Sequence, residues 1–92
     1  MLLKESLIVR NNAIPTVKMG EELSMLDVNS GKYFVLNEIG VDIWNQLEKP
    51  VSVATLLNKL LQEYDVEEEK CTLALQNYLV NMKDRALIEV VG

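Results

Sequence analysis

The chain has 92 residues, with 14 acidic and 9 basic side chains and a formal net charge of −5. This acidic balance argues against a nucleic-acid partner, because neutralising phosphates requires a basic surface, and it argues against an anionic membrane surface. A hydrophobic fraction of 49% and a charged fraction of 25% are ordinary for a soluble globular protein. We therefore expect a single domain over residues 1–92.

The cysteine content and the N-terminal sequence predict a cytoplasmic protein. Cys71 is the only cysteine, so no disulfide can form within the chain. Residues 1–6 lack the apolar core and the cleavage site of a signal peptide, and no apolar run approaches the length of a membrane span.

The first third of the chain has the composition of strands. Residues 7–9 predict a short strand, and Pro15 marks an irregular connection because it disfavours the α conformation for the residue before it. Residues 22–28 and 32–36 predict two further strands, and the turn at residues 29–31 joins them into a hairpin, with glycine where a positive φ is needed.

Three helices are predicted after the hairpin. Asn37 is placed to cap the first, which Pro50 ends. Ser52 is placed to cap the second, and Asp65, with a glutamate three residues later, to cap a third that runs to about Arg85. Apolar residues at helical spacing predict the buried faces of the three helices: Ile39, Ile43, Trp44 and Leu47; Val53, Leu56, Leu57, Leu60, Leu61 and Tyr64; Cys71, Leu75, Tyr78, Leu79 and Met82.

Residues 87–91 form a short extended tail. The predicted fold is therefore α+β and winged-helix-like, with a three-stranded antiparallel sheet followed by three helices. Such a fold suggests a DNA-binding regulator by analogy alone. The third helix argues against that alternative, because residues 67–69 are all glutamate and its few bases form no stripe.

The chain lacks the usual catalytic and metal-binding groups. Without histidine there is no histidine base for a serine or cysteine nucleophile, and a lone cysteine cannot build the usual zinc sites. The four glycines are too scattered to cradle a phosphate. We expect no enzyme activity, no metal and no cofactor.

The edge of the hairpin is a candidate binding surface. Residues 32–36 contain no proline and one charge, so an extended peptide can pair with them as an added strand. Strand alternation places Tyr33 and Val35 on one face and Phe34 and Leu36 on the other. Apolar residues on both faces indicate a sheet that is covered on both sides, or one that a ligand covers on one side.

The stretch from Leu26 to Gly40 resembles the signature of the PqqD-like family, in which a strand ends in Leu-Asn and a glycine lies inside the following helix. Ser52-Val53 matches the start of the next helix, and Leu87-Ile88 matches an apolar pair after the third. The resemblance extends from about Leu7 to Val91, although outside the hairpin and first helix it is generic to small winged helices.

The resemblance implies a recognition element for precursor peptides that are ribosomally made and then modified. In such domains the leader segment pairs antiparallel with the third strand, in a groove beside the third helix, and is presented to a separate processing enzyme. The chain is most similar to the free-standing proteins of lasso-peptide systems, whose partner is a leader protease. Members that serve a radical-SAM maturase in pyrroloquinoline quinone synthesis are the alternative, but this chain lacks their proline-rich lead-in.

The predicted peptide-binding residues follow from this resemblance and from the mixed face of the third helix. Tyr33 and Val35 are the candidates for the peptide-facing side, and Trp44 is expected in the core. A structural subunit that binds no free peptide is a third alternative, and the exposed edge can also pair with a second copy of the chain. The complete set of predicted peptide-binding residues is Lys32, Tyr33, Phe34, Val35 and Leu36 on the strand, and Leu73, Asn77, Val80, Asn81, Lys83 and Asp84 on the helix.

Overall fold

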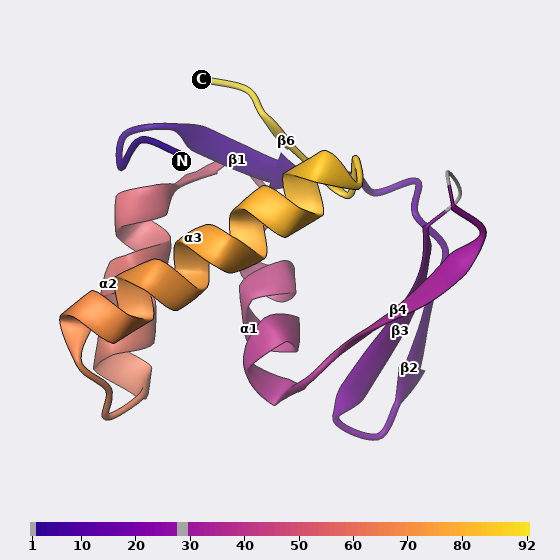
Figure 1. The fold of residues 1–92 in the computed structure, drawn as a ribbon, viewed down its shortest axis with the longest axis horizontal. Helices are drawn as coiled ribbons and strands as arrows, with labels where there is room; N and C mark the ends of the chain where they lie inside the picture. Colours follow the sequence, from indigo (N-terminus) through magenta and orange to yellow (C-terminus); the bar gives the residue numbers. More distant parts are fainter. Residues whose placement is uncertain (1, 28–29) are drawn as a thin grey trace.

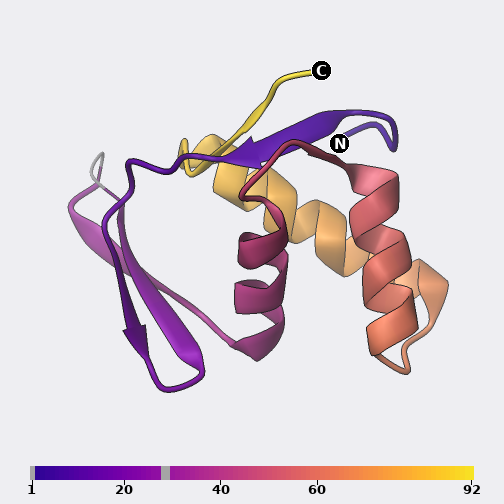
Figure 2. The same cartoon turned by 180° about the vertical axis from the view of Figure 1, so that it is seen from behind.

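The computed structural model describes residues 2–27 and 30–92 of the chain. The elements in chain order are β1 (Leu7–Arg10), β2 (Thr16–Met19), β3 (Glu22–Asp27), β4 (Lys32–Leu36), α1 (Glu38–Gln46), β5 (Val51–Ser52), α2 (Val53–Glu63), α3 (Glu68–Asp84) and β6 (Ile88–Val90). In Figures 1 and 2, helix α1 lies between helix α2 and the sheet of β2, β3 and β4, and helix α3 runs across from α2 toward that sheet.

The strands form two antiparallel sheets, with the orders β5-β1-β6 and β2-β3-β4. The prediction of an α+β fold with antiparallel strands and three helices is confirmed, and so is the hairpin of β3 and β4. The prediction of one three-stranded sheet is wrong. Strand β1 pairs with β5 and with the extended tail β6, and β2 takes the outer position beside β3.

Strand β2 lies where the sequence suggested an irregular connection. Gly20 and Glu21 form a two-residue turn between β2 and β3, since Met19 pairs with Glu22. Gly20 has a φ of +65°, whereas Glu21 does not have a positive φ, and this is the pattern of a type II′ hairpin turn. A glycine followed by one polar residue between two short alternating runs is the signal that could have revealed β2. In the next hairpin, Gly31 has the predicted positive φ of +70°, while Val28 and Asn29 lie outside the described residues.

Two of the three predicted helix caps are confirmed. The Asn37 side chain accepts a hydrogen bond from Gly40 N at 2.9 Å, and the Ser52 hydroxyl accepts one from Thr55 N at 3.1 Å. The prediction that Asp65 caps the third helix is wrong, because the backbone stays extended after α2. The N-cap of α3 is Glu67, which makes no side-chain capping bond.

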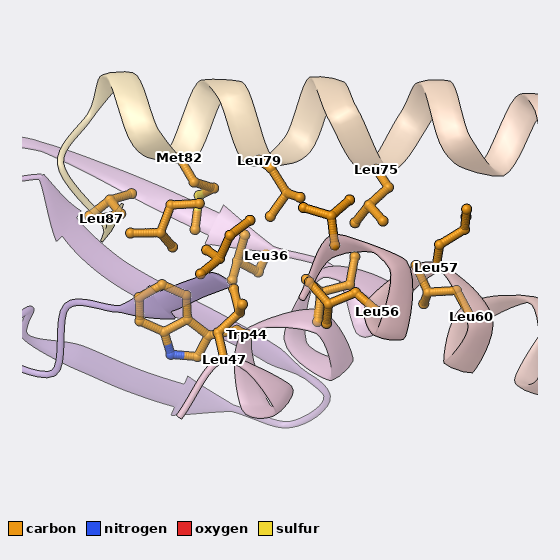
Figure 3. Packing of buried hydrophobic residues seen from close by; sticks show 14 of the residues in the cluster. Leu36, Trp44, Leu47, Leu56, Leu57, Leu60, Leu75, Leu79, Met82 and Leu87 are labelled. Carbon is orange, nitrogen blue, oxygen red and sulfur yellow. The ribbon is translucent and has the colours of Figure 1, made fainter. Parts of the chain in front are cut away.

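The hydrophobic core lies where α3 packs over α1, α2 and β4. Figure 3 shows Leu75, Leu79 and Met82 of α3 pointing toward the side chains of the other elements, among them Leu36 and Trp44. Trp44 is 4% exposed, which confirms its predicted place in the core. The apolar stripes predicted on the helices therefore face one shared cluster, except that Ile39 is 43% exposed and lies outside it because the start of α1 borders open space.

Leu79→Ala tests the packing of this core. Leu79 is fully buried, and removing such a side chain typically costs about 2–5 kcal/mol in free energy of unfolding. Urea denaturation followed by circular dichroism measures the change. The matched control is Leu73→Ala on the same helix, where the leucine is 57% exposed and the expected cost is within about 0.5 kcal/mol. Similar costs for the two variants would contradict this packing.

Candidate functional site

Strand β4 leaves one backbone edge open. Among the described residues, β4 pairs with β3 on one side and with no strand on the other. Leu26 N donates to the Pro15 carbonyl at 3.1 Å, so the backbone groups of Leu26 point toward β2. Backbone groups of successive strand residues point to alternate sides, so those of Met25 point toward β4, where Phe34 is the partner.

The same alternation along β4 decides which of its residues can bond a new strand. Phe34 and its neighbours two positions away direct their N–H and C=O groups toward β3. Tyr33 and Val35 therefore direct theirs toward the open edge. These two residues are the ones that the sequence nominated for the peptide-facing side.

The side chains of β4 divide between its two faces. Leu36 is buried and Phe34 is partly buried against the core, whereas Tyr33 and Val35 are 74% and 58% exposed. In the free chain, therefore, no part of the protein that the structure describes covers the face that carries Tyr33 and Val35. This leaves a ligand as the explanation for apolar residues on that face.

An open cavity of about 970 Å³ lies beside this edge. One wall is formed by β4 and the other by the first half of α3, and residues of α1 and the end of α2 complete the lining. We call this cavity the groove. It is lined by Glu22, Phe34, Val35, Leu36, Asn37, Ile39, Gly40, Ile43, Leu60, Tyr64, Val66, Glu67, Lys70, Cys71, Ala74, Leu75 and Tyr78.

Small residues give the groove much of its space. Gly40, Cys71 and Ala74 line it from two helices, and larger side chains in place of Cys71 and Ala74 would project into it. A Cβ atom on Gly40 would already lie 3.3 Å from the Leu36 Cβ, closer than most such contacts. The Tyr78 hydroxyl bridges the helices by donating to the Gly40 carbonyl at 3.0 Å, and burial raises the pKa of Tyr78, so this donor stays protonated.

The Tyr64 hydroxyl donates to the Asp42 carboxylate beside the groove. This hydrogen bond is the main reason that the pKa of Tyr64 is raised to about 12, and the negative charges of Glu38 and Glu63 raise it further. Lys70 forms an exposed ion pair with Glu67, with 3.4 Å between Nζ and Oε2. The groove is thus apolar inside and acidic at this margin.

Arg85 joins the two walls at the other end. Its guanidinium carbon lies 4.8 Å from the centre of the Phe34 ring, and its Nη1 lies 3.6 Å from Oδ2 of the buried Asp27. These contacts hold the C-terminal end of α3 against β3 and β4. Sequence reasoning did not single out Arg85, because neither contact follows from spacing along one element.

The structure brings some of the predicted residues to the groove and leaves others outside it. Phe34, Val35 and Leu36 line the groove, whereas Lys32 and Tyr33 lie on the same strand outside the lining. The part of α3 that lines it is instead Glu67, Lys70, Cys71, Ala74, Leu75 and Tyr78. The helix residues predicted to bind peptide are all outside the lining, and a contact with peptide stays a prediction for each of them: Leu73, Asn77, Val80, Asn81, Lys83 and Asp84.

A signal in the sequence could have indicated the face of α3 that lines the groove. Cys71 and Tyr78 were assigned to the buried face, yet both are only partly buried and line the groove. Ala74 lies beside them on the helix surface, at three and four residues' distance. A helix face that carries a cysteine, an alanine and a tyrosine at the border of the core is a better candidate for contact with a ligand than the side of the helix that points to solvent.

Residues 2–27 and 30–92 contain neither a membrane-spanning helix nor a cluster of metal-binding side chains. Within that range, no helix has the length and apolar character needed to cross a membrane. Nor does that part of the chain gather three or more side chains of the types that hold metal ions.

Comparison with known proteins identifies a family and a fold. The family model of coenzyme PQQ synthesis protein D (PqqD) matches residues 22–88. Two solved structures are similar: TbiB1 in complex with the TbiA(beta) leader peptide, at a TM-score of 0.76 and 23% identity over 91% of this chain and 98% of that one; and lasso peptide synthetase B1 complexed with the leader peptide, at a TM-score of 0.74 and 22% identity over 89% of this chain and 96% of that one.

At these identities the structural likeness is evidence for the fold. No protein of curated function matches the chain. The family model spans well over half of the chain, including the hairpin, the groove and all three helices. The protein therefore belongs to the PqqD family.

Proposed function

We propose that this protein binds the leader segment of a ribosomally made precursor peptide as an added strand along the open edge of β4. The observation that carries the proposal is the position of that edge beside the groove. The backbone of Tyr33 and Val35 offers hydrogen bonds to an extended chain, and the groove offers an apolar surface for alternate side chains.

The exposed apolar side chains around the groove support this proposal. Val35, Ile39 and Val66 remain 58%, 43% and 48% exposed although they line it. Clustered apolar exposure is unusual for a surface that stays in water and is typical of a binding site. Both structural neighbours were solved with a leader peptide bound, which is the ligand class that we propose here.

We propose that the bound leader is presented to a separate processing enzyme in the cytoplasm and that this chain itself does no chemistry. A lasso-peptide leader protease is the favoured partner, because one neighbour is a lasso peptide synthetase B1. A radical-SAM maturase is the alternative, and the family's role in coenzyme PQQ synthesis supports it. The genes beside that of this chain separate the two: a short precursor next to a protease favours the first.

Cys71 gives a direct test of groove occupancy. It is the only cysteine, it is partly buried in the groove, and burial raises the pKa of its thiol. Alkylation by iodoacetamide at pH 8 should therefore be slower in the folded chain than in urea, since the thiolate is the reactive form. A saturating leader peptide, taken from the neighbouring precursor, should slow alkylation by a further tenfold or more as measured by mass spectrometry.

The matched control moves the thiol out of the groove. In a Cys71→Ala/Asn58→Cys variant the new cysteine lies on the exposed side of α2, outside the groove lining, and its alkylation should not change when the peptide is added. If the peptide binds while Cys71 reacts at an unchanged rate, the groove is not the peptide site.

A further inference from the structure

Acidic side chains from four separate elements meet at one end of the groove. Glu22, at the start of β3, and Glu67, at the start of α3, line the cavity. Asp42 of α1 holds the Tyr64 hydroxyl, and the charges of Glu38 and Glu63 act on that same hydroxyl. Carboxylates that lie far apart in the sequence therefore surround the end of the groove where β4 runs into α1.

The bases near the groove are placed differently. Lys70 lies at the acidic end, where its ammonium group pairs with Glu67 and offsets one of the five carboxylates named there. Lys32 begins β4, and Lys83 and Arg85 lie at the C-terminal end of α3, which Arg85 holds against Phe34. The charge along the groove is thus negative at the Leu36 end, whereas at the Lys32 end the three bases outnumber the acids Asp27 and Asp84.

The uneven charge of the groove predicts where the peptide is basic, provided that the direction of the added strand is known. The family resemblance implies antiparallel pairing, and a strand added antiparallel to β4 has its N-terminal part beside Leu36 and its C-terminal part beside Lys32. We infer that the segment bound here carries lysine or arginine just N-terminal to the residues that pair with β4. The inference rests on the proposed function and adds the charge of the peptide beside the Leu36 end of β4.

The expected size of the effect is moderate. A hollow with apolar walls and charges of one sign concentrates the field and attracts the opposite charge. Each exposed ion pair is worth about two- to fivefold in affinity, so two basic residues should improve binding by roughly tenfold. Salt should weaken this gain, since the screening length is about 8 Å at physiological ionic strength.

A displayed library of random twelve-residue peptides provides the test, because it presumes no particular precursor. The wild-type chain should enrich peptides with an alternating apolar core and with lysine or arginine on its N-terminal side. Glu22→Lys/Glu63→Lys/Glu67→Lys, which reverses three charges at the acidic end, should lose that preference and select acidic residues there. The control Glu5→Lys/Glu48→Lys/Glu89→Lys changes the same net charge at exposed positions outside the groove lining and should select as the wild type does.

The outcomes separate this inference from the proposed function. Peptides that bind the wild type without a basic bias, or with the bias on the C-terminal side, would overturn the inference and leave strand addition standing. The same bias in both triple variants would overturn it as well. If none of the selected peptides binds at the β4 edge, the proposal of strand addition is wrong, and the inference about charge is then wrong as well.

Discussion

Val35→Pro is expected to weaken leader-peptide binding by at least about tenfold while the chain stays folded. The Val35 N–H points to the open edge, so proline removes a donor that an added strand needs and places its ring where that strand would lie. The lost hydrogen bond alone costs about 1–3 kcal/mol, which is roughly five- to a hundredfold in affinity. Isothermal titration with the leader peptide measures the change, and circular dichroism checks the fold.

The matched control is Lys18→Pro on β2, the other outer strand of the same sheet. Lys18 pairs with Leu23, and the backbone alternation turns its N–H away from β3, so proline there also removes only an outward donor. Binding should be unchanged in this variant. Equal losses in the two variants would show that the sheet as a whole was disturbed, and full binding by a folded Val35→Pro variant would contradict strand addition at β4.

Ala74→Trp is expected to reduce binding by about tenfold to a hundredfold. Ala74 lines the groove from α3 and is exposed in the free chain, so an indole fits there without disturbing the core. It would occupy the space that the apolar side chains of the peptide need, and such overlap costs about 1–3 kcal/mol. Fluorescence polarisation with a labelled leader peptide measures the loss.

Leu73→Trp is the control for this variant and also tests the predicted helix face. Leu73 was expected from the sequence to contact peptide, yet it lies outside the groove lining and is 57% exposed. The geometry predicts normal binding for Leu73→Trp and weak binding for Ala74→Trp. The reverse result would mean that the peptide contacts the outer face of α3.

Much of the fold could be predicted because the residues that determine local structure also have the positions that the tertiary structure requires. The strand at residues 32–36 is dense in aromatic and β-branched residues, and Asn37 and Ser52 cap their helices through bonds within three residues of sequence. The apolar stripes identified the core because helical spacing fixes which side chains share a face. The same spacing placed Trp44 correctly.

The sequence does not decide those features that depend on contacts between distant parts of the chain. Strand β1 could equally have joined the hairpin, and only the positions of β5 and β6 show that it belongs to a second sheet. The face of α3 that forms the groove depends on how that helix crosses β4, which Arg85 and Phe34 fix from distant parts of the chain. Periodicity separates buried from exposed residues, but it does not show which partly buried margin borders a cavity.

A second copy of the chain remains a predicted partner of an open edge, and both β2 and β4 offer one. The two edges differ in surroundings, since only β4 borders the groove. If copies pair through β4, peptide should dissociate the dimer, and sedimentation velocity with and without peptide would detect this.

Amide hydrogen exchange of residues 32–36, with and without the leader peptide, tests strand addition most directly. The account predicts an alternating pattern, because Tyr33 and Val35 gain partners while Phe34 and Leu36 already bond β3. Exchange should slow strongly at Tyr33 and Val35 and change little at Phe34 and Leu36. A peptide that binds without slowing exchange at Tyr33 and Val35 would contradict the central claim.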